Sequence, residues 1–403
     1  LSYSNTQGEY ASYLYGGNPG VLNSVLANNS LVWETTSNVD YGFDAGFLNN
    51  RIEFSFTGYN KLTSDRLYDK SLPAQTGFSS IKANLGVVQN KGIELSLTAR
   101  PLSGGPVSWD ITATFAMNRT YMKELPDNGR DKNRVQGGLI WDTKSGTYIE
   151  AGGLAEGERI GGRWGYKYLG VYDTDEAAAL APEDTKVSKI GKNKVAGDAI
   201  WADMDGNGVI DDKDIVFIGW ANPDKKGALI NTLGYKGFTF RFVVDYALGH
   251  SIANVWRCRA NANARNAIVT TTDVTNGNIW WSQGDAATAK YPRYDVASDW
   301  DNGYRNHMRT IAYAGMNSNG NADNTAYYSK GDYLCFREIS LSYDLPRSIC
   351  SKLKMQGISL TAGANNLGYI TAFDGLNPEQ YDGQETGEYF IPIQFNFGAR
   401  LTF

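Results

Sequence analysis

Cysteine and histidine are scarce in this sequence, which holds three cysteines and two histidines among 403 residues. The cysteines form no CxxC pair, so their pattern excludes a disulfide framework and a zinc site of the usual ligand spacing. Two imidazoles leave little for catalysis or metal binding built on histidine. No apolar run approaches the roughly 18 residues that a membrane-spanning helix needs, which excludes a helical membrane protein.

An excess of positive charge is also lacking. There are 38 Lys and Arg residues against 43 Asp and Glu residues, and the net charge is −5. Because phosphate binding needs a basic face, this balance argues against a nucleic acid as the main partner. The sequence has no HExxH, GxSxG, P-loop or dinucleotide-binding motif, so we expect neither an enzyme nor an organic cofactor.

The sequence does contain a regular alternation of apolar and polar residues, together with 13% aromatic residues and 45 glycines. Apolar side chains at every second position predict β-strands with one dry face. In one such segment, Ile52, Phe54 and Phe56 alternate with polar residues. Strands are predicted in this way at 38–47, 52–57, 93–100, 107–117, 227–236, 238–248, 332–345, 358–365 and 395–403.

The polar positions of these strands carry carboxylates and arginines, while the opposite positions carry aromatic and aliphatic side chains. A water-filled lumen and a lipid-facing exterior produce this pattern in a transmembrane barrel. A soluble β-sandwich also alternates and is the alternative fold. In a barrel, the charged residues expected to line the lumen are Asp40, Asp44, Glu53, Glu94, Asp110, Arg241, Asp245 and Arg400.

Short and long connections between the strands follow one another in alternation. The long ones are 67–87, 122–226, 253–331 and 371–392. Short turns at one end and long extracellular loops at the other are typical of an outer-membrane barrel, so we predict an all-β fold, a transmembrane antiparallel β-barrel. Lipid does not tolerate an open sheet edge, and bacterial barrels have even strand numbers. We therefore expect residues 1–403, with about nine or ten strands, to be the C-terminal β-barrel portion of a longer chain.

An acidic motif lies inside the second long loop. Residues 203–214 read DMDGNGVIDDKD and match a twelve-residue calcium loop. In such a loop, oxygen ligands surround a hard cation, and a glycine permits the sharp turn. The corresponding ligands are Asp203, Asp205, Asn207, the Val209 carbonyl, Asp211 and Asp214. The pattern indicates a structural Ca²⁺ site in an external loop, and the alternative is an acidic turn that binds no ion.

The third long loop, 253–331, is rich in Trp, Tyr and Asn. Flat aromatic faces beside amide donors suit sugar rings and peptide backbones, and large rigid aromatics also suit a protein interface. The alternative is that these side chains pack the loop itself. The candidates for contact with a substrate or with a partner protein are Trp280, Trp281, Trp300 and Tyr304.

Several stretches, in this order and spacing, resemble the C-terminal half of SusC/RagA-type TonB-dependent outer-membrane transporters. They are LVWETTSNVDYGFDAGFLNNRIEFSFTGYNKLTSDRL (31–67), NKGIELSL (90–97), DMDGNGVIDDKDIVFIG (203–219), YLCFREISLSYDLP (333–346), GANNLGYITAFDGLNPE (363–379) and the terminal FNFGARLTF. The resemblance covers nearly the whole chain. It implies a barrel of about 22 strands with an N-terminal plug inside. No stretch of this chain matches the plug or the first strands.

The resemblance also implies a function, namely active import of oligosaccharides or oligopeptides across the outer membrane of a Gram-negative bacterium. A SusD-like surface lipoprotein is expected to cover the extracellular mouth as a lid. The TonB–ExbB–ExbD complex is expected to supply energy through the N-terminal region, and outer-membrane lipid surrounds the barrel. Two alternatives stay open: a passive porin-like channel, and a secreted β-sandwich that binds or cleaves glycans.

Overall fold

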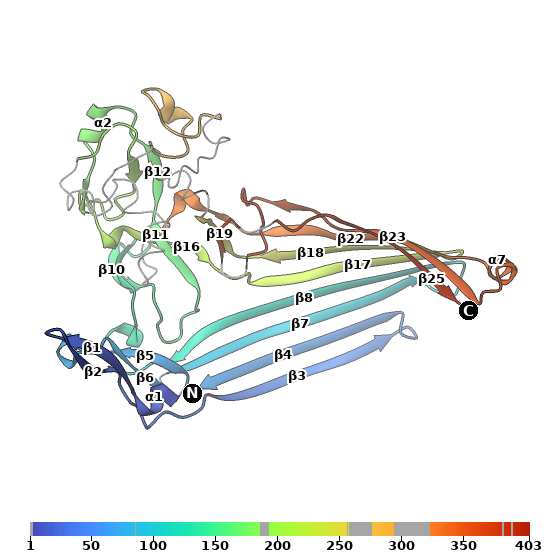
Figure 1. Ribbon diagram of the computed structural model, residues 1–403. Coiled ribbons are helices and arrows are strands. Elements are labelled where there is room, and N and C mark those ends of the chain that lie inside the picture. The colour runs from blue at the N-terminus through green and yellow to red at the C-terminus, as the bar shows by residue number, and fades with distance from the viewer. Residues whose placement is uncertain are drawn as a thin grey trace.

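An antiparallel sheet forms the body of the molecule (Figure 1). The computed structural model describes residues 3–84, 86–185, 193–255, 257, 276–293, 323–380, 383–387 and 390–403. The sheet consists of β3 (Thr35–Phe47), β4 (Ile52–Ser64), β7 (Val87–Leu102), β8 (Val107–Glu124), β17 (Lys225–Tyr235), β18 (Phe238–Leu248), β22 (Tyr333–Asp344), β23 (Gly357–Thr371) and β25 (Gln394–Thr402). Its nine strands lie in the order β25-β23-β22-β18-β17-β8-β7-β4-β3, which is the reverse of their order along the chain, so each strand lies beside the next one in sequence.

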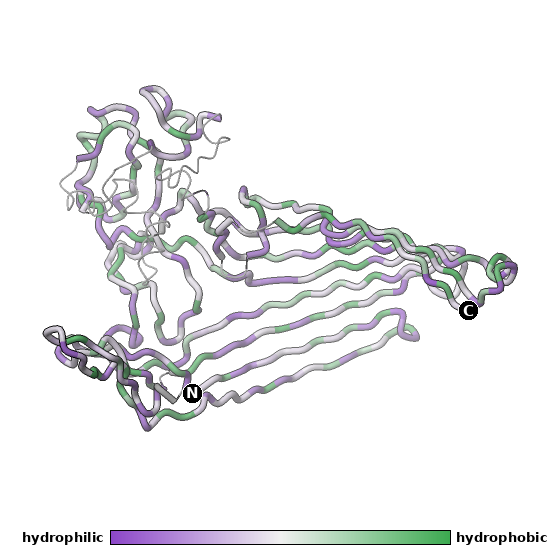
Figure 2. Tube along the Cα trace, viewed as in Figure 1, coloured by the Kyte–Doolittle hydropathy of each residue, from purple (hydrophilic) through white to green (hydrophobic). Residues whose placement is uncertain are grey.

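The strand register keeps one kind of side chain on each face of this sheet. Phe43 lies opposite Phe56, and Phe56 lies opposite Leu95, so apolar side chains line up across three strands. The positions between them are polar, as where Asp44 lies opposite Ser55. Figure 2 shows the result as hydrophobic and hydrophilic residues that alternate along the strands. We call the two surfaces the apolar face and the polar face.

The apolar face is open to its surroundings. Phe43 is 58% exposed and Phe397 is 82% exposed. A β-sandwich would bury such rings between two sheets, and within the described residues no second sheet covers them. The sandwich alternative is therefore wrong. An exposed row of aromatic and aliphatic side chains opposite a charged row is the arrangement of a transmembrane barrel wall.

The two ends of the sheet differ in their connections. At one end the connections are short, namely 48–51, 103–106, 236–237 and 345–356, the last of which includes α7 (Arg347–Lys352). Lys236 and Gly237 both have positive φ, 47° and 86°, as in the type I′ turns that match the twist of two-residue hairpins. The long connections all leave the sheet at the opposite end (Figure 1), as predicted.

The long connections fold into small sheets rather than extended loops. Their strands are β5 (Leu67–Ser71) with β6 (Ser80–Asn84); β9 (Gly138–Asp142) with β10 (Thr147–Ala151); β11 (Gly162–Tyr166) between β16 (Ile215–Trp220) and β20 (Asp323–Asn324); β12 (Tyr168–Val171) with β14 (Ala199–Trp201); β13 (Glu183–Asp184) with β15 (Val209–Ile210); and β19 (Ser251–Asn254) between β21 (Tyr328–Lys330) and β24 (Gln384–Glu385). The helices are α2 (Asp175–Ala179), η1 (Ala74–Thr76), η2 (Asp131–Asn133), η3 (Asp212–Asp214), η5 (Asp285–Ala287) and η7 (Thr325–Tyr327). We call the described residues of 125–224 and 249–332 the cap. Before β3, the chain forms α1 (Tyr3–Gln7) and a hairpin of β1 (Glu9–Tyr15) and β2 (Asn18–Val25).

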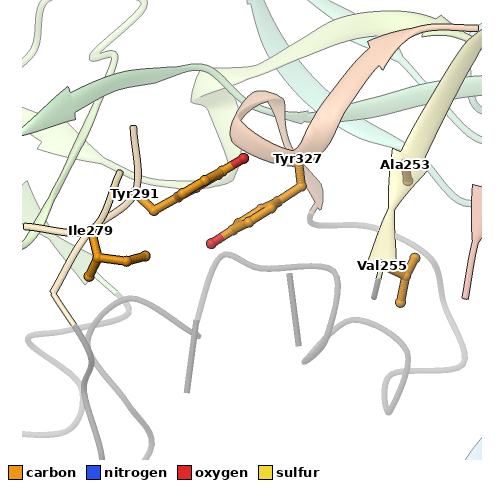
Figure 3. Packing of buried hydrophobic residues seen from close by; sticks show 5 residues of the cluster. All are labelled: Ala253, Val255, Ile279, Tyr291 and Tyr327. Carbon is orange, nitrogen blue, oxygen red and sulfur yellow. The ribbon is translucent and has the colours of Figure 1, made fainter. Parts of the chain in front are cut away.

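Two buried clusters hold the cap together. One consists of Tyr166, Ala199, Trp201 and Ile210. The other joins residues from three separate segments, and in it the rings of Tyr291 and Tyr327 stack with centroids 5.2 Å apart (Figure 3). Its members are Ala253, Val255, Ile279, Tyr291 and Tyr327. Burial of these side chains gives the cap its own hydrophobic core, separate from the sheet.

The nine predicted strands are confirmed, and four of them run six or seven residues further toward the cap than predicted. The added stretches are 58–64, 87–92, 118–124 and 366–371. In the first three stretches polar side chains occupy both faces, so the alternation stops although the backbone ladder continues. No helix among the described residues is long and apolar enough to cross a membrane.

Candidate functional site

The charged residues predicted to line the lumen all lie on the polar face. In β3 and β4, Asp40 pairs with Tyr59, and Glu53 pairs with Gly46, which puts both carboxylates on the same side of the sheet. The register carries this assignment across the remaining strands. The residues on this face are Asp40, Asp44, Glu53, Glu94, Asp110, Arg241, Asp245 and Arg400.

Several of these carboxylates are engaged by side chains of neighbouring strands. Arg100 donates to Glu53 at 2.7 Å, and the Arg100 Nε lies 3.9 Å from Asp110. The Arg241 Nε lies 3.3 Å from Glu338. These pairs are partly exposed, so each adds little to the free energy of folding. They indicate a hydrated wall in which some of the charges are paired across neighbouring strands.

A larger charged cluster forms around Arg337, a residue that no sequence pattern marks. Arg337 lies at a β-bulge, because its neighbours pair across β18 and β23 while it is skipped. A bulge redirects a side chain relative to the regular pleat. Its guanidinium donates to Asp245 at 2.6 and 3.1 Å and to Glu379 at 2.6 Å. Tyr369 donates to the same Glu379 oxygen at 2.5 Å. This Arg337 cluster ties the connection after β23 to the polar face.

Three of the predicted cation ligands converge in the loop 203–214. The carboxylate oxygens of Asp203, Asp205 and Asp214 lie within 4.8 Å of one another. Asp203 also shapes the turn, since it accepts the backbone N–H groups of Gly206 and Gly208, each at 2.8 Å. The loop therefore brings together its first, third and twelfth positions, as the motif predicts.

Asp214 closes this loop from the buried side. It accepts the backbone N–H groups of Met204 at 2.7 Å and of Asp211 at 2.8 Å. Burial, followed by the nearby charges of Asp205 and Asp203, raises the pKa of the Asp214 carboxyl. A divalent cation between the three carboxylates would remove that repulsion, so these residues fit a hard cation with oxygen ligands.

The other predicted ligands also take part in the turn. Asp211 caps η3 by accepting the Lys213 N–H at 2.7 Å, and its second oxygen lies 3.3 Å from the Lys213 ammonium. Asn207 accepts the N–H of Val209 at 2.7 Å. Val209 itself lies in β15. Of the six predicted ligands, the three carboxylates of Asp203, Asp205 and Asp214 converge, and the coordination by Asn207, Val209 and Asp211 stays a prediction. The Tyr148 hydroxyl, which donates to Asp205 from β10, is an additional contact that the motif does not indicate.

The predicted aromatic contacts divide into buried, exposed and undescribed residues. Trp280 is 8% exposed, and its indole N–H donates to Asp173 at 3.2 Å, so it packs inside the cap. Trp281 is 54% exposed and stays the described candidate for substrate or lid contact. Trp300 and Tyr304 lie outside the described residues.

Asp173 joins the two parts of the cap and is a second residue that sequence reasoning missed. Its carboxylate accepts the backbone N–H groups of Gly284 at 2.8 Å and Ala286 at 3.2 Å, as well as the Trp280 indole N–H. These donors, the Gly284 N–H first, lower the pKa of the Asp173 carboxyl. The partners lie more than 100 positions away, with sequence separations of 107 to 113, so no local signal marks this residue.

Comparison with known proteins gives relatives for nearly the whole chain. The model of the family described as TonB dependent receptor-like, beta-barrel, matches residues 1–209. TonB-dependent receptor P3 of Formosa agariphila is 30% identical over 362 residues, which cover 89% of this chain and 32% of the relative. TonB-dependent receptor SusC of Bacteroides thetaiotaomicron is 23% identical over 401 residues, which cover 98% of this chain and 34% of the relative. The chain thus spans about a third of the length of these curated relatives.

A solved structure shares the fold. The structure of the RagAB peptide transporter matches with a TM-score of 0.70 and 20% identity, over 99% of this chain and 38% of that chain. At this identity the match shows the fold alone.

These findings establish the family and the location. The family model covers more than half of the chain, and its β-barrel description agrees with the exposed apolar face. The family is one of outer-membrane proteins of Gram-negative bacteria that transport rather than catalyse, which confirms the predicted location and the expectation that the chain is not an enzyme. The chain belongs to the TonB-dependent receptors and forms part of their transmembrane β-barrel.

Proposed function

We propose that the chain supplies the C-terminal wall and the cap of an outer-membrane importer for oligosaccharides or oligopeptides. The observation that carries the proposal is a charged sheet face whose long connections fold into a cap at one end only. Such a wall offers a wetted path, and such a cap offers a binding surface outside the membrane. A SusD-like lipoprotein covers the mouth, and TonB–ExbB–ExbD acts on the N-terminal region of the whole protein.

The names of a relative and of a solved structure with the shared fold support this proposal. One relative bears the name SusC, and the solved structure with the shared fold is named as a peptide transporter. Aromatic side chains beside amides, as in the 253–331 connection, suit both sugar rings and peptide backbones. A passive channel would have the same wall, and energy dependence is the property that separates it from an importer.

Uptake in cells tests the proposal. A strain that lacks the full-length gene should lose uptake of labelled oligosaccharides or of labelled oligopeptides, and the complete gene should restore it. Removal of TonB should reduce uptake as strongly as removal of the receptor. The measurement is accumulation of label in the periplasm for each substrate class. Uptake that continues without TonB would identify a passive channel, and normal uptake of both classes in the deletion strain would contradict import of these nutrients.

We also propose that Asp203, Asp205 and Asp214 bind a structural Ca²⁺ ion. The proposal rests on their convergence within 4.8 Å and on the raised pKa of Asp214. When bound, the ion supplies charge that holds the acidic turn against β10, where Tyr148 contacts Asp205. Protonation of Asp214 competes with the cation. Because its pKa is raised, binding should weaken on acidification at a higher pH than for an ordinary aspartate.

Terbium luminescence of the full-length protein in detergent measures this binding. Tb³⁺ in the loop should emit on excitation of aromatic residues, because Tyr148 contacts Asp205 and Trp141 lies 5.1 Å from the Tyr148 ring. Ca²⁺ should displace it. Asp205→Asn should weaken binding about tenfold through loss of one ligand charge. Asp142→Asn is the control. Asp142 is an acidic turn residue of the β9–β10 hairpin that also carries Tyr148, but it does not belong to the three converging carboxylates. Equal emission from both variants would contradict the site.

A further inference from the structure

The apolar face ends abruptly at a row of positive charge on the side of the cap. Ile93 lies opposite Met117, and both carry apolar side chains. One row further toward the cap on the same face, Lys91 lies opposite Arg119. Lys225 pairs with Met117 from the other side and therefore also points from the apolar face. Like charges directly opposite in a sheet are unfavourable, so this row needs counter-charge.

Aromatic and acidic side chains fix the cations of this row. The Lys91 ammonium lies 4.5 Å above the ring of Tyr121, which is two positions beyond Arg119 on the same face. The backbone of Arg159, in the cap, pairs with that of Tyr121 in an isolated antiparallel β-bridge. The guanidinium of Arg159 lies 4.2 Å above the ring of Trp220. These stacked positions limit the motion of the cations before any ligand arrives.

The carboxylate present among these cations does not neutralise them. Asp224 accepts two hydrogen bonds from Arg119, both at 2.7 Å, and lies 3.1 Å from Arg159. It thus serves two guanidinium groups, while Lys91 and Lys225 are exposed and have no carboxylate of their own among the described ion pairs. We call Lys91, Arg119, Arg159 and Lys225 the basic row. The basic row carries four positive charges and Asp224 one negative charge, so the group as a whole has a net charge of +3.

We propose that the basic row binds the phosphate groups of lipopolysaccharide in the outer leaflet. The row lies on the lateral wall, where the lipid-facing residues end on the extracellular side, and not on the polar face that lines the lumen. Phosphates of a membrane lipid lie at this level, between the acyl chains and the sugars. Basic residues next to a membrane-spanning segment attract anionic headgroups, and the effect is large enough to measure for each residue.

Binding of lipid A to the full-length protein in detergent tests the proposal. The probes are lipid A with its phosphates and the same lipid after removal of its phosphates. The double variant Lys91→Gln, Lys225→Gln should bind phosphorylated lipid A about 25-fold more weakly, roughly fivefold for each lysine. Both lysines are exposed, so the variant should keep the heat-modifiable mobility of a folded barrel. Lys91→Gln alone serves as a milder second variant and should lose about fivefold.

Lys236→Gln is the matched control. Lys236 also lies over an aromatic ring, that of Tyr235 at 5.2 Å, but at the short-turn end of the sheet. The Lys236→Gln variant should bind phosphorylated lipid A with the same affinity as the wild-type protein. Wild-type affinity in the double variant, or equal affinity for the two lipids, would overturn the proposal. Displacement of lipid A by inorganic phosphate at millimolar concentration would also overturn it, because the row would then be a small-anion site.

Discussion

Replacing Arg337 by glutamine is expected to lower the free energy of unfolding by about 2–3 kcal/mol and to release the connection after β23 from the wall. The change leaves Asp245 and Glu379 facing one another without their shared cation. Loss of one partner of a buried pair costs about 3–5 kcal/mol, and the partial exposure of this cluster reduces that figure. Denaturant unfolding in detergent gives the free energy, and limited proteolysis reports release of residues 372–387.

Arg241→Gln is the control for this variant. Arg241 also pairs with a carboxylate on the polar face, but its side chain is 41% exposed and engages one partner, Glu338. Its replacement should cost less than about 1 kcal/mol and should leave proteolysis unchanged. If the two variants unfold alike, the Arg337 cluster does not fasten the connection and is an ordinary wall pair.

Replacing Trp201 by alanine should unfold part of the cap while the barrel stays intact. Trp201 is buried with Ala199 and Ile210, and its ring lies 6.4 Å from that of Tyr166 and 5.6 Å from that of Tyr168. Truncation of a buried tryptophan costs about 3–5 kcal/mol, which is comparable to the stability of a small packed unit. Terbium emission from the acidic loop should fall with it, because Ile210 lies inside that loop.

Leu180→Ala provides the contrast, since Leu180 lies in the cap at 87% exposure and its loss should cost under about 0.5 kcal/mol. Heat-modifiable mobility on gels reports the barrel, and protease resistance of residues 125–224 reports the cap. Loss of the barrel signal in Trp201→Ala would show that cap and sheet fold as one unit, contrary to the separate cores described above.

The strands were predictable because the sheet has a different solvent on each side. Water on one face and hydrocarbon on the other force alternation along residues such as Ile52, Phe54 and Phe56. The extensions toward the cap were not predictable, because beyond Lys91 and Arg119 both faces are wet and the alternation disappears. The small sheets of the cap could not be predicted either, because strands of two to six residues have too few positions for an alternation to be recognised.

The residues of the candidate site also divide into those that a local sequence pattern marks and those that it does not. The acidic loop was predictable because its ligands lie within twelve consecutive residues, 203–214, and Gly208 marks the turn. The Arg337 cluster was not, since a bulge changes which face a residue occupies and Glu379 comes from another connection. Trp280 reads as a contact residue in sequence, but its packing partner Asp173 is 107 positions away.

The order of the strands has a consequence for how this protein diversifies. Neighbours in the sheet are neighbours in the chain, whether two residues separate them, as at Lys236-Gly237, or the whole span 125–224. The entropy of closing a connection grows only with the logarithm of its length, so a tenfold longer insertion costs about 2 kcal/mol more. Long connections at the cap end can therefore be exchanged, lengthened or shortened during evolution at little cost in stability, while the strands of the sheet stay the same.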